Sequence, residues 1–498
     1  MRDERMTVRV LLCQDVEDKG LPVASLLSFL QEQGVEAQVA SQLCPHPYQI
    51  AQKAKGADQL IVATCYRWEA AGELEEYARR AGVSPLAFQV VPLARICEGD
   101  PRPLEKAQAS LAMAVLRARA FPGARPENLR PYLLPRQRRI TRRALFSLSS
   151  LSYRPIPTVH RARCRAEDGC RQCVHTCPHE ALEEEGGIIQ LRREACTSCG
   201  ACVMACPQLA LEMPGWSPEE VRAELEAALA YGQGRGIAFI CPQIAPPGGP
   251  WMAVRVPCAS AVSVAALLFA LQGGAVAVGH CRHQCQSGLR QVVEARLDFC
   301  RSLLTALGKD PVIIPLVDAT DGHIDLPVPP LQERGPTSIG PIAGAGADAQ
   351  AILSLTGDHL LTLAHEGAPL GVAQVDESSC TLCSSCAFSC PTGALGYEER
   401  EGQAFLSFEA TLCIACGQCV ESCPERERGA IAIWRGVDTA TLREGRKTVA
   451  KDEMVSCQRC GERVATAKML SRLEGLLGAQ FSSRRMAQLC QDCRGLPL

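Results

Sequence analysis

The sequence has 498 residues, of which 47% are hydrophobic, and its formal net charge at pH 7 is −2. This length predicts three or more domains with buried cores. The balanced charge argues against a nucleic-acid-binding protein and gives no reason for attraction to a membrane surface, so we expect protein partners. The chain contains 29 cysteines and begins without an apolar signal segment. We therefore expect a cytoplasmic protein with reduced thiols instead of disulfides.

Residues 1–120 alternate strand-like runs, the first of which is VRVLL, with helical stretches such as LPVASLLSFLQEQG. This alternation predicts a small parallel α/β domain. Its cysteines follow strand-like runs, and the carboxyl ends of parallel strands share one edge, where ligands bind. We predict that four cysteines converge there on a [4Fe-4S] cluster, the alternative being four ordinary buried cysteines. The four are Cys13, Cys44, Cys65 and Cys97.

Residues 121–160 form a basic, proline-containing stretch. Twelve arginines and one acidic residue, Glu127, lie between Arg117 and Arg163. Such a run predicts a solvated linker, and the alternative is a clamp for an acidic partner surface. The twin arginines at 142 and 143 imitate an export signal, but they lie far inside the chain and no long apolar stretch follows, so we interpret them as linker.

Residues 161–215 contain two cysteine motifs that each end in Cys-Pro. In bacterial dicluster ferredoxins, three thiolates of one motif bind one [4Fe-4S] cluster and the fourth, before the proline, binds the neighbouring cluster. The spacing therefore predicts two clusters, the first with a longer initial gap of five residues. The ligand sets are Cys164, Cys170, Cys173 and Cys206 for one cluster and Cys196, Cys199, Cys202 and Cys177 for the other.

Residues 216–320 predict a central α/β domain with a helix near 218–231. The segment 259–279 has no charged residue and the length of a membrane span, but a Gly-Gly pair divides it into a helix and a buried strand, which an α/β core explains. Cysteines again follow strand-like runs. Cys300 lies within a helix and is expected in the core, and a mixed site that includes His280 and His283 stays open. The strand-end cysteines are Cys241, Cys258, Cys281 and Cys285.

Residues 321–375 read as a Pro- and Gly-rich linker with one helix, and residues 376–435 repeat the dicluster pattern with regular spacing. Zinc ribbons and disulfide scaffolds do not repeat such motifs. We therefore predict two more [4Fe-4S] clusters, which brings the ferredoxin-type total to four. Their ligand sets are Cys380, Cys383, Cys386 and Cys423 for one and Cys413, Cys416, Cys419 and Cys390 for the other.

Residues 436–498 contain two Cys-x2-Cys pairs separated by the helix-like run KMLSRLEGLLG. This pattern predicts a zinc-ribbon-like segment, in which a four-cysteine zinc site holds together a piece too small for its own core. A further iron-sulfur cluster is the alternative. The four cysteines are Cys457, Cys460, Cys490 and Cys493.

Two parts of the chain resemble known families. The runs VRVLLC, LIVATC and VVPLARIC resemble the N-terminal part of the heterodisulfide reductase A subunit. The run RVPC followed by ALQGGAVAVGHCRHQC is similar to the delta subunit of methyl-viologen-reducing hydrogenase, a hydrogenase iron-sulfur subunit. The second resemblance implies a [2Fe-2S] cluster on the four central strand-end cysteines. No GxGxxG follows a strand, so we expect neither FAD nor NAD on this chain.

These features predict an electron-transfer subunit that passes electrons through several iron-sulfur clusters and has no catalytic residue of its own. The resemblances imply a hetero-oligomer with a soluble hydrogenase, formate dehydrogenase, heterodisulfide-reductase-like subunit or flavoprotein. The alternative is an oxidoreductase whose substrate reacts directly at the N-terminal or central cluster. A nucleic-acid-binding scaffold is disfavoured because basic and aromatic residues do not interleave near residues 457–493.

Overall fold

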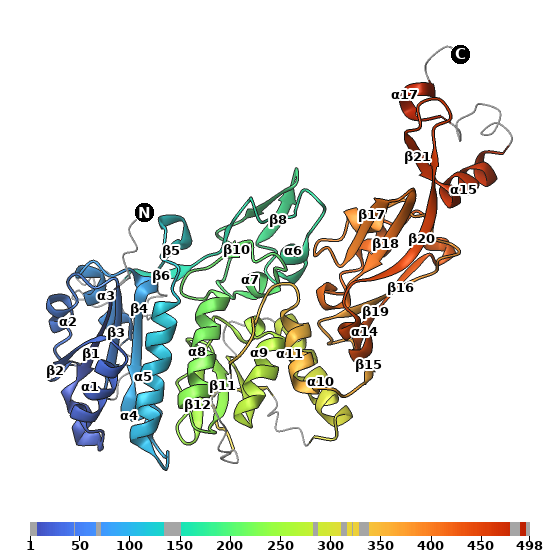
Figure 1. The fold of residues 1–498 in the computed structure, drawn as a ribbon. Coiled ribbons are helices and arrows are strands. Elements are labelled where there is room, and N and C mark those ends of the chain that lie inside the picture. Colours follow the sequence, from blue (N-terminus) through green and yellow to red (C-terminus); the bar gives the residue numbers. More distant parts are fainter. Residues whose placement is uncertain are drawn as a thin grey trace. The chain divides into compact units, whose positions relative to one another are not determined.

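The computed structural model describes residues 7–43, 45–65, 71–133, 151–281, 287–309, 316–320, 322–327, 338–478 and 489–494. Internal contacts divide the chain into two compact units, whose elements are labelled in Figure 1. The first comprises Met1–Arg163, Cys173–Glu185 and Ile189–Ala347, and the second comprises Cys164–Gln172, Gly186–Ile188 and Asp348–Leu498. Within the described ranges, no helix is both long and apolar enough to cross a membrane.

A four-stranded parallel sheet with the order β2-β1-β3-β4 forms the N-terminal domain (Figure 1). Its strands are β1 (Val8–Cys13), β2 (Glu36–Ala40), β3 (Gln59–Thr64) and β4 (Phe88–Pro92). All six residues of β3 are buried, as expected for a parallel sheet that is covered on both faces. The covering helices are α1 (Val23–Glu32), α2 (Tyr48–Lys53), α3 (Ala71–Arg80), α4 (Leu93–Cys97) and α5 (Pro103–Arg119). The prediction of a small parallel α/β domain is confirmed.

The strand order creates a reversal point in this sheet. From β1 the chain passes outward to β2 and then returns to β3 on the other side of β1. In open parallel sheets, ligands bind beyond the carboxyl ends of the two strands at which the order reverses. Here those ends are Cys13, the last residue of β1, and Cys65, which directly follows β3.

Short elements surround the cysteine loops of the first ferredoxin-like module. The antiparallel pairs are β5 (Leu129–Leu133) with β6 (Leu151–Pro155), β7 (Thr158–Val159) with β10 (Leu211–Glu212), and β8 (Leu182–Glu185) with β9 (Ile188–Leu191). Two one-turn helices, α6 (Gln172–Thr176) and α7 (Ala201–Ala205), contain cysteines of the two motifs. Helices this short position a few side chains and contribute few residues to the hydrophobic core.

The central domain is a second parallel sheet, with the order β12-β11-β13-β14. The segment 259–279 forms a 3₁₀ turn, helix α9 and most of strand β13, so the predicted passage from helix to buried strand is confirmed. The predicted helix at 218–231 is also present, and Ser217 and Glu220 form a capping box at its start. The elements are α8 (Pro218–Tyr231), β11 (Gly236–Ile240), β12 (Trp251–Arg255), α9 (Val264–Ala270), β13 (Val276–His280), α10 (Ser287–Ala306) and β14 (Val317–Asp318).

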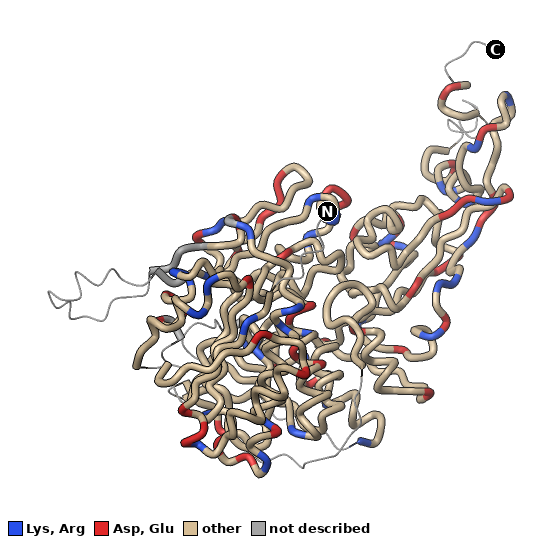
Figure 2. Tube along the Cα trace, turned by 60° about the vertical axis from the view of Figure 1, so that its left-hand side comes forward, with Lys and Arg blue, Asp and Glu red and all other residues tan. Residues whose placement is uncertain are grey.

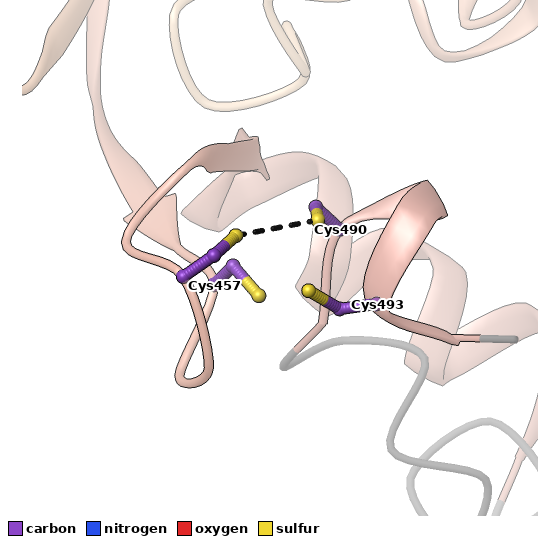
Figure 3. A group of neighbouring side chains, drawn as sticks. Cys457, Cys490 and Cys493 are labelled. Carbon is purple, nitrogen blue, oxygen red and sulfur yellow. Dashed lines mark hydrogen bonds between the residues drawn. The ribbon is translucent and has the colours of Figure 1, made fainter. Parts of the chain in front are cut away.

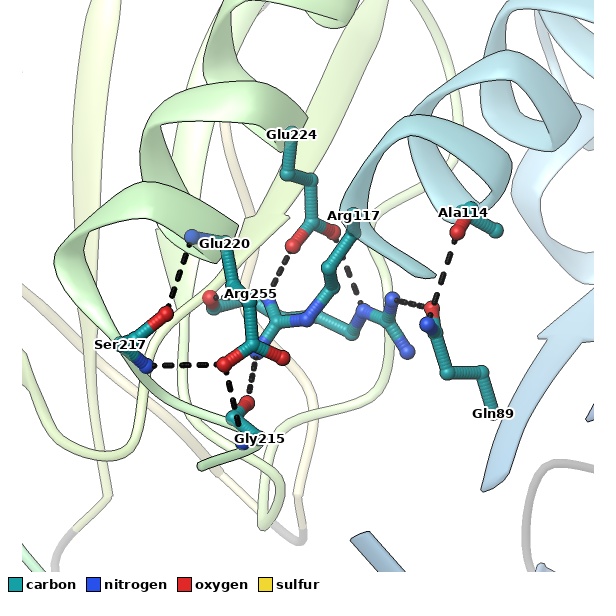
Figure 4. A network of polar contacts seen from close by, with 8 residues as sticks. All are labelled: Gln89, Ala114, Arg117, Gly215, Ser217, Glu220, Glu224 and Arg255. Carbon is teal, nitrogen blue, oxygen red and sulfur yellow. Dashed lines mark hydrogen bonds and ion pairs between the residues drawn. The ribbon is translucent and has the colours of Figure 1, made fainter. Parts of the chain in front are cut away.

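A buried polar network joins α5 of the N-terminal domain to α8 and β12 of the central domain (Figure 4). Arg117 pairs with Glu224 and donates to the Arg255 carbonyl, and Arg255 pairs with the same Glu224 at 3.0 Å. Burial raises the pKa of Glu220 to about 7, although backbone N–H groups of Gly215 and Ser217 donate to its carboxylate. The two sheets therefore belong to one unit that buried charges hold together.

A second buried pair lies nearby in the same unit. Arg235 donates two hydrogen bonds of 2.8 Å to Asp100, and the exposed fractions of their side chains are 1% and 0%. Burial opposes the ionisation of Asp100. The hydrogen bonds from Arg235 and from the Arg102 N–H, together with the charges of Arg235 and Lys106, outweigh it and hold the pKa of this carboxyl below its usual range. Burial lowers the pKa of Lys106 to about 8, and its Nζ donates to the Gly249 carbonyl.

The second unit consists of two antiparallel sheets, with the orders β15-β19-β16 and β17-β18-β20-β21. Strand β20 pairs with β18 of the ferredoxin-like module and, further along, with β21 of the C-terminal segment. One strand thus connects the two parts. The strands are β15 (Thr362–Ala364), β16 (Gly371–Val375), β17 (Leu395–Arg400), β18 (Gln403–Phe408), β19 (Ile431–Asp438), β20 (Lys447–Ser456) and β21 (Arg463–Thr466); the helices are α11 (Ala347–Thr356), α12 (Ser385–Phe388), α13 (Gln418–Glu421), α14 (Thr439–Glu444), α15 (Ala467–Leu477) and α17 (Gln491–Arg494).

Charged residues of both signs are interspersed along the described chain. Figure 2 shows Lys and Arg alternating with Asp and Glu over short distances, in agreement with 52 basic and 54 acidic residues in the sequence. Large fields of one sign favour nucleic acids or charged membranes, whereas a mixed surface does not. Over the described residues the charge distribution therefore indicates no binding surface, and the cysteines are the candidate functional residues.

Candidate metal and cluster sites

The second ferredoxin-like module arranges its eight cysteines around two separate cavities. Cys380, Cys383, Cys386 and Cys423 line the first cavity. Burial, together with the charges of the other three cysteines of this set, raises the pKa of the Cys386 thiol to about 12. The second cavity is lined by Cys390, Cys413, Cys416 and Cys419. Each cavity thus includes one cysteine of the opposite motif, Cys423 in the first and Cys390 in the second.

Three cysteine loops share one backbone conformation. In each Cys-x2-Cys-x2-Cys loop, the residue before and the residue after the middle cysteine have positive φ. An L-residue in this region costs about 1–2 kcal/mol, and such strain is typical of functional loops. The pairs are Leu382 (φ 50°) and Ser384 (φ 65°), Ala415 (φ 51°) and Gly417 (φ 80°), and Ser198 (φ 63°) and Gly200 (φ 73°). The repetition supports the same use for all three loops.

In the first module, the structure brings together the set made of Cys177, Cys196, Cys199 and Cys202. Burial raises the pKa of Cys202 well above its usual value, and the sulfurs of the other three add to this effect. The first-cluster set is different, because Cys164 and Cys170 belong to the second unit while Cys173 and Cys206 belong to the first. All four are buried or half-buried, and their joint use stays a prediction.

In the central domain, three strand-end cysteines gather at one edge of the sheet. Cys241 follows β11, Cys258 comes soon after β12 and Cys281 follows β13. The pKa of the Cys241 thiol is raised. Its hydrogen bond with Cys281 is the largest cause, burial is the second, and the charge of Cys258 adds to them. Cys285 and His283 lie outside the described residues. These three positions agree with the predicted metal-binding edge.

His280 ends β13 directly before Cys281, and its side chain has its own polar partners. The Nδ1 atom of His280 hydrogen-bonds Asp318 at 2.9 Å, and Arg290 donates to the same carboxylate at 2.7 Å. His280 is not among the residues that line the cavity beside Cys241 and Cys281. Cys300 is fully buried in α10, as expected for a core residue.

One cavity of about 440 Å³ is shared by the first module and the central domain. Its lining includes Cys199 of the module together with Cys241, Cys258 and Cys281 of the central sheet. Cys258 also acts electrostatically on the Cys199 thiol, whose pKa burial raises to about 11. The two thiol groups are therefore close neighbours inside one unit.

Gly200 lies in close contact with the residues around Cys258. It follows Cys199, and a Cβ atom at this position would lie 2.5 Å from Cγ of Pro257, the residue before Cys258. It would also lie 3.2 Å from Cε of Met213. Only glycine lets the cysteine loop pack this tightly against the central domain.

We expect Gly200→Ala to weaken this contact, because the new Cβ overlaps Pro257 and also strains a positive φ. Gly417→Ala is a matched control, since Gly417 holds the same place in its loop with φ +80° but would meet nothing within 4 Å. Thermal denaturation and iron content of the anaerobically purified variants measure the difference. A loss equal to that of the control would contradict a tight Gly200 contact.

Two of the N-terminal cysteines lie close together beside a carboxylate. Ligand atoms of Cys13, Asp15 and Cys65 lie within 4.8 Å of one another. Cys97 lies outside this group, where its Sγ donates to the Pro103 carbonyl at 3.2 Å and Lys106 is a neighbour. Cys44 lies outside the described residues. Asp15 was missed in the sequence, although an acidic residue two positions beyond a strand-end cysteine was a usable signal.

The C-terminal segment brings its four cysteines into one compact group (Figure 3). One ligand atom from each lies within 4.8 Å of the others, and the sulfurs of Cys460 and Cys490 are 3.6 Å apart. Backbone hydrogen bonds, the largest at Cys490, lower the pKa of Cys457 to about 6. A tetrahedral zinc ion with Zn–S bonds of about 2.3 Å requires sulfurs about 3.8 Å apart, so this set fits one ion.

Comparison with known families identifies part of this arrangement. The 4Fe-4S dicluster domain family matches residues 379–427, and the 4Fe-4S binding domain family matches residues 189–212. Both matches fall on the cysteine loops described above. No curated protein matches the chain. The chain therefore contains two 4Fe-4S ferredoxin-type domains, set among parallel α/β sheets.

Proposed function

We propose that this protein is an electron-transfer subunit that carries four [4Fe-4S] clusters and a [2Fe-2S] cluster. The observation that carries the proposal is the gathering of the eight cysteines of the second module around two separate cavities. A third cavity is lined by Cys199 of the first module and three central cysteines. Each cluster, when bound, accepts and donates single electrons. The proposed ligands are the sixteen ferredoxin cysteines and, for the [2Fe-2S] cluster, Cys241, Cys258, Cys281 and Cys285.

The chain's own contribution is to hold thiolates in place, exclude water and hydrogen-bond the sulfurs. The backbone N–H of Ala181 donates to Sγ of Cys177, and that of Ala210 donates to Sγ of Cys206, both at 3.2 Å. Such hydrogen bonds and the burial of the thiolates set the reduction potential of a cluster. No acid-base residue is required for this role.

The partners follow from the resemblances and from the lack of a dinucleotide motif. We propose that the subunit works in the cytoplasm within a hetero-oligomer, beside a soluble hydrogenase, formate dehydrogenase or heterodisulfide-reductase-like subunit. A partner brings any flavin that the assembly uses. The C-terminal set, Cys457, Cys460, Cys490 and Cys493, binds zinc and stabilises a segment with a very small core.

The experiment that tests the function supplies the anaerobic protein first with a dye acceptor alone and then with a reduced hydrogenase or formate dehydrogenase. Electron transfer only in the presence of the dehydrogenase or hydrogenase supports the relay. Clusters that stay oxidised with every donor, although iron and sulfide are present, would contradict it.

A zinc chelator tests the C-terminal site. We expect chelation to remove the zinc bound by these four cysteines and to expose residues 457–478 and 489–493 to hydrogen exchange, because few apolar contacts hold this segment. The iron-sulfur absorbance should stay unchanged. Bleaching in parallel with the exposure would show that a cluster occupies this site.

A second candidate function rests on the shared cavity. Its volume of about 440 Å³ falls within the range of small-molecule sites, and cysteines of two proposed clusters line it. An oxidoreductase with direct substrate chemistry at the central site would use this space. Steady reduction of a small acceptor by the chain and a chemical reductant, without any protein partner, would favour this function, provided that a bulky substitution such as Leu86→Trp in the cavity wall blocks it.

A further inference from the structure

The end of the N-terminal sheet carries a set of potential ligands that differs from a ferredoxin site. Cys13 ends β1, Asp15 lies two residues later in a 3₁₀ turn, and Cys65 directly follows β3. The order β2-β1-β3-β4 reverses between β1 and β3, which is where open parallel sheets bind ligands. The fold therefore brings two thiols and a carboxylate to its expected ligand position.

The spacing of these ligand atoms distinguishes a single ion from a cluster. In a [4Fe-4S] cluster each thiolate binds a different iron, which separates the sulfurs, whereas one tetrahedral zinc ion brings S and O ligands within about 3.5–3.8 Å of each other. Among the described residues, two groups of three or more potential ligands lie within 4.8 Å. They are the four C-terminal cysteines and the set Cys13, Asp15 and Cys65.

The ferredoxin loops provide an internal comparison. No three of their described cysteines meet the same 4.8 Å limit, although each set lines a common cavity in the second module. The cysteine sets whose ligand atoms exceed this limit are therefore those whose sequence motifs indicate clusters. By this comparison, the compact N-terminal set belongs with the C-terminal one.

Charge also favours a cation between these three side chains. Backbone N–H groups of Leu43 and Asp15 donate to the Cys13 sulfur, and Cys65 and the Asp15 carboxylate lie beside it. Three acidic groups this close repel one another when ionised, and a bound cation removes that cost. The backbone N–H donors suit a metal-bound thiolate.

Cys97 has a different environment. Its Sγ donates to the Pro103 carbonyl at 3.2 Å, and it lies beside Lys106 and the Asp100–Arg235 ion pair. These partners account for a buried cysteine without a metal. Cys97, one of the four cysteines of the predicted N-terminal [4Fe-4S] cluster, thus donates its hydrogen bond to a backbone carbonyl. The Asp15 carboxylate lies beside Cys13 and Cys65 instead.

We propose that Cys13, Asp15 and Cys65 bind a single zinc-type metal ion at the reversal point of the N-terminal sheet, in place of a [4Fe-4S] cluster. Mixed cysteine and aspartate ligands are within the normal range for zinc, which has no redox chemistry. The N-terminal domain then carries no electrons, and its metal stabilises the edge of the sheet. This site is independent of the proposed electron-transfer function.

The test measures zinc, iron and acid-labile sulfide per chain in the full-length protein, purified without oxygen. We expect about two zinc ions and, from four [4Fe-4S] clusters and one [2Fe-2S] cluster, about 18 iron atoms. Cys65→Ala and Asp15→Ala should each lose about one zinc with iron and sulfide unchanged. Cys97→Ala, the matched control, should lose neither metal.

Loss of about four iron and four sulfide from Cys65→Ala would overturn the proposal in favour of a cluster. A zinc content that none of these substitutions alters would also overturn it. Because Ala variants could unfold the domain, Asp15→Asn provides a milder change, and we expect faster zinc release to a chelator. In a Cys457→Ala background, zinc-edge X-ray absorption should show about two sulfur neighbours with oxygen; four sulfurs would contradict an Asp15 ligand.

Discussion

Replacing Cys386 with alanine is expected to remove one [4Fe-4S] cluster, that is about four iron and four sulfide atoms per chain, while the other clusters remain. Cys386 lines the same cavity as Cys380, Cys383 and Cys423, and the charges of these three act on its thiol. The neighbouring set lines a separate cavity. Iron and sulfide analysis, together with EPR spin counting of the reduced protein, measures the loss.

Two variants control this experiment. Cys419→Ala should remove the other cluster of the same module, because Cys419 belongs to the second cavity. Cys300→Ala changes a fully buried cysteine in α10 and should leave the iron content unchanged. Equal loss from both clusters after substitution of Cys386 alone would contradict the separation of the two sets.

The ferredoxin-type parts could be predicted from the sequence because local spacing determines them. A loop of seven residues places three thiols, and the proline after the fourth cysteine directs it to the other cluster. The same loops matched known 4Fe-4S domains. The parallel sheets were also predictable, since uninterrupted apolar runs alternate with amphipathic helices.

The N-terminal site was harder to predict because its geometry depends on strand order. The sequence shows cysteines after four strand-like runs but does not show that β1 and β3 flank the reversal point. The sequence pattern grouped Cys97 with the other strand-end cysteines. In the structure Cys97 ends helix α4, and its Sγ donates to the Pro103 carbonyl. Asp15 could be identified as a candidate ligand only from the distances between side-chain atoms.

Polar pairs between residues far apart in the chain also could not be predicted from the sequence. Asp100 and Arg235 are 135 residues apart, and nothing in the local pattern around either residue predicts their pairing. Strand β20 is a similar case, because its two halves pair with different partners. Such features depend on how domains pack, and periodicity reports only which face of an element is buried.

The Asp100–Arg235 pair should have the largest effect on the stability of the first unit. Both side chains are buried, so Asp100→Ala leaves a buried guanidinium without its carboxylate and should cost about 3–5 kcal/mol. This cost corresponds to at least about a hundredfold increase in the fraction of molecules in which the first unit is unfolded. Limited proteolysis and hydrogen exchange over α5 and β11 would measure it.

A double substitution separates the loss of a charge pair from the loss of packing. Asp100→Leu with Arg235→Met replaces both charges by apolar side chains, and we expect it to recover most of the stability, since a buried pair often contributes little beyond well-packed apolar residues. A double variant as unstable as Asp100→Ala would show that the hydrogen bonds of Arg235 to the Gly232 and Arg102 carbonyls matter more.

The same pair predicts how stability depends on pH. Arg235 holds the pKa of Asp100 below its usual value, so the folded state binds this proton more weakly than the unfolded chain does. The stabilisation is therefore fully present above about pH 4, the unfolded pKa of an aspartate, and is lost as the pH falls through the lower folded value. Asp100→Ala should remove this part of the acid sensitivity. Since the pair joins the N-terminal to the central domain, we expect acid to separate these domains before either sheet unfolds.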